Sequence, residues 1–137
     1  MTQRVKILVD ICLVVLLVLL FFTEDILSVH TFLGYALIPV IIIHLLLNGK
    51  WLVASTKKLF SGKLTSKSRY MYALFIGLTI AFSVCIGSGI ALLYSSISFM
   101  CDLHEISAYV CVALVILHVQ VHWKYIKSFF SNKSKIA

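Results

Sequence analysis

Residues 30–51, HTFLGYALIPVIIIHLLLNGKW, place two histidines 14 positions apart in an apolar run. Residues 104–125, HEISAYVCVALVILHVQVHWKY, repeat this arrangement with an offset of 74 residues. The offset matches His30 with His104, Gly34 with Ala108, Tyr35 with Tyr109, His44 with His118, Lys50 with Lys124, and Trp51 with Tyr125. A repeat of this kind indicates a duplicated helical hairpin with pseudo-two-fold symmetry.

The composition extends this interpretation to the whole chain. Its 137 residues are 61% hydrophobic and 12% charged, which leaves too little polar surface for a soluble domain of this size. Four apolar runs, with their flanking residues, are long enough to cross a bilayer as helices, at about residues 5–22, 30–51, 69–95 and 104–127. The sequence therefore predicts an all-α, integral-membrane four-helix bundle built from two repeated helical hairpins, with residues 1–137 as a single domain.

The basic residues indicate how the helices are oriented. Of the twelve Lys and Arg residues, two precede the first apolar run, six lie between the second and third, and four follow the fourth. The other two connections carry only acids, at Glu24, Asp25, Asp102 and Glu105. Because positively charged loops stay in the cytoplasm, both termini are expected there. The net charge of +7 is thus a topology signal, and no nucleic-acid partner is expected.

His44 and His118 lie inside apolar helices, where an ionisable side chain by default indicates a functional site. Fourteen helical residues bring the second histidine within about 40° of the first and about 21 Å further along the axis. The second and fourth helices run in the same direction. We therefore expect His30 to face His104 near the outer surface, and His44 to face His118 nearer the cytoplasm. For any single histidine, a hydrogen bond to a neighbouring helix is the simpler alternative.

Two imidazoles that face each other across a bundle form a bis-histidine site for haem iron. Iron accepts neutral imidazole ligands, so two levels of histidine predict two haems. The sequence holds no Cys-x-x-Cys-His motif, and covalent haem attachment is not indicated. A bare metal ion, bound or transported by the same histidines, is an alternative. The separation of about 21 Å disfavours it, because ligands lie about 2 Å from an ion. A membrane anchor that recruits a redox partner is the third interpretation.

Other residues could take part in haem binding. Gly34 and Ala108 follow the outer histidines by four positions and would let a porphyrin approach the helix, although close helix packing also explains them. Lys50, Arg69 and Lys124 lie near the inner level, where they could pair with haem propionates. Positive-inside signalling is the simpler account of each of these three cations.

His122 competes with His118 as the inner ligand, because it follows His104 by 18 residues, or five full turns. The repeat favours His118, which it matches with His44. His122 would then lie near the cytoplasmic rim, where it could bond a propionate, line a quinone pocket, or belong to an interfacial belt. Asp10 is the one acid near the cytoplasmic end of a helix. It could pair with a basic neighbour, relay protons or, most simply, extend to the interface.

Two His-x13-His helices in a four-helix bundle resemble the transmembrane di-haem cytochrome b superfamily, which includes ferric-reductase-like proteins. The likeness is strongest to small bacterial four-helix cytochrome-b-like proteins that carry His-x3-His-Trp at the end of a ligand helix, here HVQVHW at residues 118–123. The resemblance spans roughly residues 5–127 and departs at Asn48, the counterpart of His122. It implies two b-type haems and electron transfer in a bacterial cytoplasmic membrane.

The connection over residues 52–68 holds no glycine-rich phosphate loop and no nicotinamide or flavin fingerprint. Electrons would therefore come from or go to a quinone, a soluble carrier, or a partner subunit such as a flavoprotein or an iron–sulfur protein. The scaffold could equally serve as a quinol oxidase or as a reductase of ferric iron or oxygen species.

Overall fold

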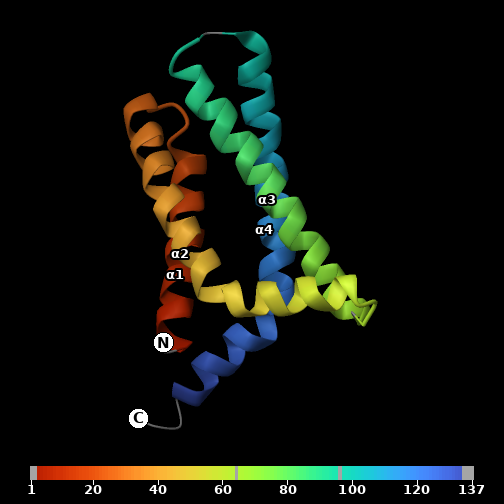
Figure 1. Ribbon diagram of the computed structural model, residues 1–137. Helices are drawn as coiled ribbons and strands as arrows, with labels where there is room; N and C mark the ends of the chain where they lie inside the picture. The colour runs from red at the N-terminus through yellow and green to blue at the C-terminus, as the bar shows by residue number, and fades with distance from the viewer. Residues whose placement is uncertain (1–2, 64, 96, 134–137) are drawn as a thin grey trace. The chain divides into compact units, whose positions relative to one another are not determined.

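The structure, a computed structural model, describes residues 3–63, 65–95 and 97–133. Four helices account for this part of the chain: α1 (Gln3–Phe22), α2 (Leu27–Phe60), α3 (Ser66–Leu92) and α4 (Ser98–Lys133), labelled in Figure 1. The described residues contain no strand. The predicted all-α, four-helix fold class is therefore confirmed.

All four helices are long and apolar enough to cross a membrane. Many of their large apolar side chains point outward, and Leu8, Phe32 and Leu46 are 65%, 72% and 75% exposed. Water would penalise this much exposed apolar surface, whereas lipid tails solvate it. The chain is accordingly an integral membrane protein that meets the lipid bilayer along its helices.

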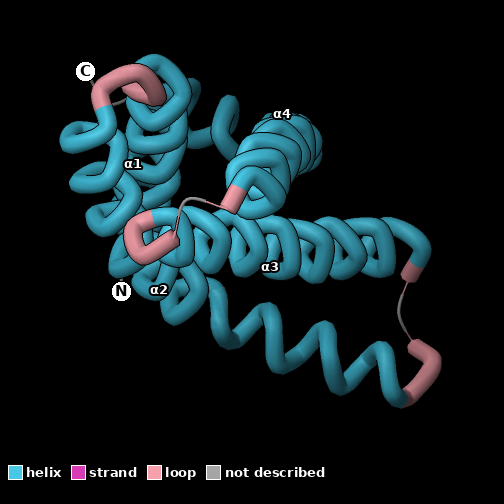
Figure 2. The backbone as a smooth tube through the Cα atoms, turned by 90° about the horizontal axis from the view of Figure 1, so that it is seen from above, coloured by secondary structure: helices cyan, strands magenta, loops and turns pink. Residues whose placement is uncertain are grey.

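The chain forms two compact units, Met1–Lys63 and Leu64–Ala137. In the first unit α1 packs against α2, and in the second α3 packs against α4, so each unit is one helical hairpin (Figure 2). Ile7 and Leu37 are buried in the first hairpin, and Leu74, Ala81 and Cys111 in the second. The two hairpins inferred from the repeat are thus present.

The boundary between the hairpins has a local cause. The amides of Ser61, Gly62 and Lys63 bond back to the carbonyls of Lys57, Leu59 and Lys58, which ends α2. Gly62 adopts a φ of +68°, a left-handed conformation that glycine reaches without steric cost. Thr65 then caps α3, where its hydroxyl oxygen accepts the Ser68 N–H at 3.4 Å.

Two helices extend well beyond the predicted bounds, whereas α3 is shifted to Ser66–Leu92 from the predicted 69–95. α2 begins three residues before the predicted range 30–51 and continues nine residues past it, and α4 begins six residues before the predicted 104–127 and continues six past it. The prediction followed the apolar residues, but backbone hydrogen bonding continues past the apolar run into the more polar sequence beside it. The C-terminal part of α2, yellow in Figure 1, turns away from α1. The longer helices place His30 in the first turn of α2 and His104 in the second turn of α4.

Candidate haem-binding site

His30 is held by the end of the neighbouring helix. Its Nδ1 lies 3.1 Å from the carbonyl oxygen of Leu20, near the C-terminus of α1. The last four carbonyls of a helix lack partners from within it, so they are ready acceptors. A carbonyl can only accept a hydrogen bond, hence Nδ1 carries the proton and donates it. In a neutral ring this tautomer puts the lone pair on Nε2, the nitrogen through which His30 would ligate a metal.

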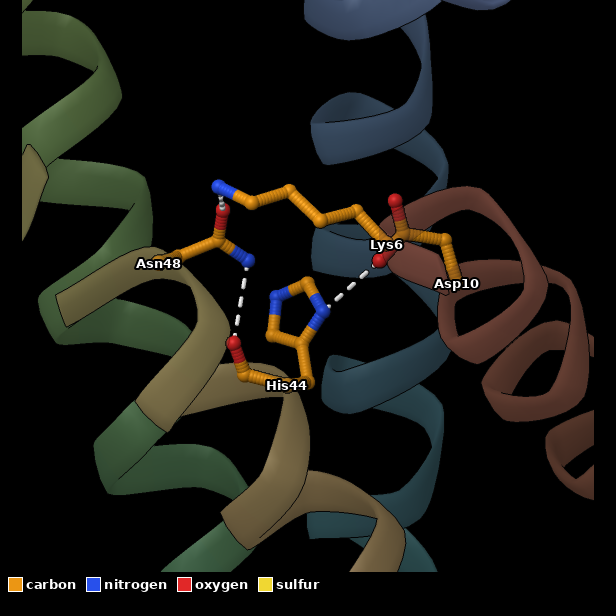
Figure 3. Close-up of polar contacts among 4 residues, drawn as sticks. All are labelled: Lys6, Asp10, His44 and Asn48. Carbon is orange, nitrogen blue, oxygen red and sulfur yellow. Dashed lines mark hydrogen bonds and ion pairs between the residues drawn. The ribbon is translucent and has the colours of Figure 1, made fainter. Parts of the chain in front are cut away.

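His44 has a carboxylate in the corresponding position. Its Nδ1 lies 2.7 Å from Oδ1 of Asp10, one helix away in the same hairpin (Figure 3). An N–H that donates to a carboxylate makes a shorter and stronger hydrogen bond than one that donates to a neutral carbonyl. In a neutral ring, Nε2 of His44 again carries the lone pair with which it would ligate a metal. Asp10 therefore pairs with a neighbouring ring, rather than extending to the interface as the simplest interpretation of the sequence held.

Two further hydrogen bonds surround this pair. Asn48 donates through Nδ2 to the His44 carbonyl at 3.0 Å, and Lys6 donates through Nζ to Asn48 Oδ1 at 3.3 Å (Figure 3). Asn48 is the repeat counterpart of His122, so the two hairpins use this position differently. In the first hairpin it connects α1 to α2, one turn below the candidate ligand.

His104 repeats the arrangement of His30 in the second hairpin. Its Nδ1 lies 2.8 Å from the carbonyl oxygen of Cys85 in α3, and 3.4 Å and 3.8 Å from Ser88 Oγ and Cys85 Sγ. Ser88 donates its own proton to the carbonyls of Val84 and Cys85, at 2.8 and 3.0 Å. The Cys85 carbonyl therefore defines the His104 tautomer, with Nδ1 protonated and Nε2 assigned to ligation.

Gly89 allows His104 to take this position. A Cβ at residue 89 would stand 2.9 Å from Cε1 and 3.1 Å from Nδ1 of His104, which is closer than real Cβ contacts. The imidazole thus lies on bare backbone of α3, in space that any larger residue would fill. At Gly77, which precedes Gly89 on α3, a Cβ would make only ordinary contact with Leu114, at 3.5 Å.

His118 and His122 lie one turn apart on α4, with ring centroids 4.7 Å apart and planes tilted by 45°. Both are half-buried. The choice between them as inner ligand stays a prediction that favours His118. Extending the α3–α4 pairing seen at residues 85 and 104 puts residues 71–75, MYALF, at the level of His118, and this segment contains no acid. The carboxylate–histidine pair of the first hairpin thus has no acidic equivalent in that segment.

The remaining candidates differ in their surroundings. A Cβ at Gly34 would meet no atom of the described residues within 4 Å, so packing in this part of the structure does not require a glycine there. Ala108 is half-buried, whereas Lys50, Arg69 and Lys124 are exposed, as cations at a membrane rim would be.

Each hairpin contributes one histidine of each expected pair. His30 and His44 both belong to α2, and His104 and His118 both belong to α4. The pairing of the two levels across the hairpins stays a prediction. Within residues 3–63, 65–95 and 97–133, no group of three or more His, Cys, Asp or Glu side chains could hold a bare metal ion. A haem with two axial histidines needs no such group.

The hydrogen-bond partners of Nδ1 in His30, His44 and His104 were not predicted from the sequence. The two peptide carbonyls carry no sequence signal, because every residue has one. Asp10 did carry a signal: an acid inside an apolar run is rare and usually has a partner. Antiparallel pairing of α1 and α2 around the short turn at residues 23–25 would have placed it near His44.

Comparison with known protein families, curated proteins and solved structures gives no match to this chain. We therefore infer the function from the geometry of the histidines and of their hydrogen-bond partners.

Proposed function

We propose that this protein is a di-haem b-type membrane cytochrome that transfers electrons across or within the membrane. One observation carries the proposal. Three of the four expected ligands, His30, His44 and His104, have Nδ1 hydrogen-bonded to an acceptor on the adjacent helix of their own hairpin. A structural histidine makes the same bond to a neighbouring helix, and the repeated spacing of 14 residues is what favours ligation over that alternative. Metal-ligating histidines almost always donate their second N–H to a carboxylate or a backbone carbonyl, which sets the tautomer and the ring orientation.

The donor set is suited to haem. His30 and His104 would ligate one haem, and His44 and His118 the other, each through a neutral imidazole nitrogen. The exposed apolar side chains of the helices suit a large apolar ring, and Gly34, one turn after His30, would present no side chain to it. Lys50, Arg69 and Lys124 would pair with propionates at the rim. When bound, b-type haem supplies one-electron exchange at its iron.

Topology and partners follow from the same proposal. The distribution of the basic residues puts both termini in the cytoplasm, and the resemblance puts the protein in a bacterial cytoplasmic membrane. His44 and His118 then form the inner level, and His30 and His104 the outer level. The redox partners are a quinone, near His122, or a flavoprotein or iron–sulfur subunit. Activity as a quinol oxidase or as a reductase of ferric iron or oxygen species would follow from the acceptor.

The test is spectroscopic. The full-length chain is purified in detergent from cells supplied with a haem precursor. Its reduced-minus-oxidised spectrum is recorded together with a pyridine haemochrome assay. We expect the spectrum of low-spin b-type haem and about two haems per chain, as two bis-histidine levels require.

Protein that folds and inserts but shows no haem absorbance would contradict the proposal. Metal found by elemental analysis without a Soret band would point to the bare-ion alternative instead. A membrane anchor would keep its recruiting function after all four histidines were replaced, and this result would also count against a haem carrier.

A further inference from the structure

We propose that Asp10 is a positioning residue that lowers the reduction potential of the haem at the inner level, which favours transfer of an electron from the inner level to the outer one. This inference rests on the proposed haem function. It assigns a role to a residue in the membrane-spanning part of α1, outside the set of expected ligands, and it biases the energetic direction of the relay.

The three histidines donate their Nδ1 protons to different kinds of acceptor. His30 and His104 donate to peptide carbonyls at 3.1 and 2.8 Å, whereas His44 donates to a carboxylate at 2.7 Å. The carbonyls are neutral, so the carboxylate makes the strongest of the three hydrogen bonds. Of these three histidines, His44 alone therefore combines a negatively charged acceptor with the shortest contact.

A carboxylate acceptor changes the electron density of a ligating imidazole. A carboxylate that draws the Nδ1 proton toward itself increases the electron density on Nε2, and thus the basicity of the ligand. Reduction adds one electron to ferric iron and removes one positive charge from the site. A basic ligand and a nearby negative charge both favour the ferric form, so the carboxylate of Asp10 makes this reduction less favourable.

Partial exposure and a neighbouring cation both bear on the pair formed by His44 and Asp10. The side chains of His44 and Asp10 are 24% and 41% exposed, so their interaction is only partly screened. Lys6, one turn before Asp10 on α1, donates its N–H to Asn48, and Asn48 in turn bonds the His44 carbonyl. The Lys6 charge opposes that of Asp10. Asp10 bonds the His44 ring directly at 2.7 Å, however, whereas Lys6 reaches His44 only through Asn48, so the carboxylate acts on the ligand at shorter range.

The consequence is directional. By lowering the potential at the inner level, the carboxylate would make transfer of an electron from an inner haem held by His44 and His118 to an outer haem more favourable than it would be with a neutral acceptor. In the topology that the basic residues indicate, the direction runs from the cytoplasm outward. The class of reaction that fits is oxidation of a donor on the inner side coupled to reduction of an acceptor on the outer side.

The experiment is a spectroelectrochemical titration of the full-length haem-loaded protein and its Asp10→Asn variant. Asparagine keeps the size of the side chain and a neutral acceptor. We expect one of the two one-electron components to shift upward by about tenfold in its reduction equilibrium, or ~59 mV, while the other is unchanged. The ferric haem should also change its electron paramagnetic resonance g-values at one site only. Asp25→Asn, which removes the same charge from the exposed turn between α1 and α2, is the matched control and should leave the component that Asp10→Asn shifts in place.

Two further variants make the result decisive. In a His104→Ala background, where the outer haem is absent, Asp10→Asn should still shift the remaining component. If Asp10→Asn expels a haem, Asp10→Glu retains a carboxylate at altered geometry, and we expect a smaller shift in the same direction.

Unmoved potentials in whichever of these variants retain haem, or a shift confined to the outer level, would overturn the inference. A structural role alone would lower haem content without moving either potential, and it too would overturn the inference. Absence of haem from the wild-type protein is a separate result, which refutes the proposed function itself.

Discussion

Replacing His104 with alanine is expected to remove one haem from the purified protein and to leave the other in place. Without the His104 imidazole, a haem held by two axial histidines loses one of its two protein ligands. The Cys85 carbonyl also loses the ring whose orientation it sets. His30→Ala should remove the same haem. His44→Ala and His118→Ala should each remove the other. The pyridine haemochrome assay should fall from about two haems per chain to about one in each single variant.

Pairs of substitutions test how the histidines are matched. His30→Ala with His104→Ala should lose no more haem than either alone, because residues that act as one unit are not additive. His30→Ala with His44→Ala should lose both haems. His122→Ala is the control at the inner level and should retain two. If His122→Ala removes a haem and His118→Ala does not, the two histidines exchange roles. If no histidine variant changes the haem content, the ligand assignment is wrong.

Replacing Gly89 with alanine is expected to displace the His104 ring. The new Cβ would stand 2.9 Å from Cε1 of that ring, and the imidazole is rigid. The ring must rotate or α3 must move away, and either change lengthens the 2.8 Å bond to the Cys85 carbonyl. Loss of such an orienting bond typically costs 10- to 100-fold in metal affinity, so we expect haem retention to weaken by about tenfold. The overpacking itself should cost the second hairpin about 1–3 kcal/mol.

Gly87→Ala is the matched control for this prediction. A Cβ at residue 87 would meet no described atom within 4 Å, and alanine is the better helix former by about 1 kcal/mol. The rate at which each variant gives up haem to an apoprotein acceptor compares the two directly. Equal rates for Gly89→Ala and Gly87→Ala would show that the backbone of α3 does not hold the ring in place.

The helices and their number could be predicted because lipid imposes them. A chain segment in hydrocarbon must satisfy its own backbone hydrogen bonds, so each long apolar run becomes a helix. The ends were less predictable. α2 continues to Phe60 because helical hydrogen bonding persists until Gly62 turns the backbone, and hydropathy does not record that turn.

The sequence by itself determined that His30 and His44 share a face of one helix and that α4 repeats the pattern, because helical periodicity depends only on spacing. The partners of the rings were decided by tertiary structure. The 2.7 Å bond from His44 to Asp10 and the approach of His104 to Gly89 and the Cys85 carbonyl depend on how far one helix slides along the other. A shift of one residue would turn each contact by about 100° around the helix. That register is set by side-chain packing and turn length within each hairpin, which the spacing of histidines does not encode.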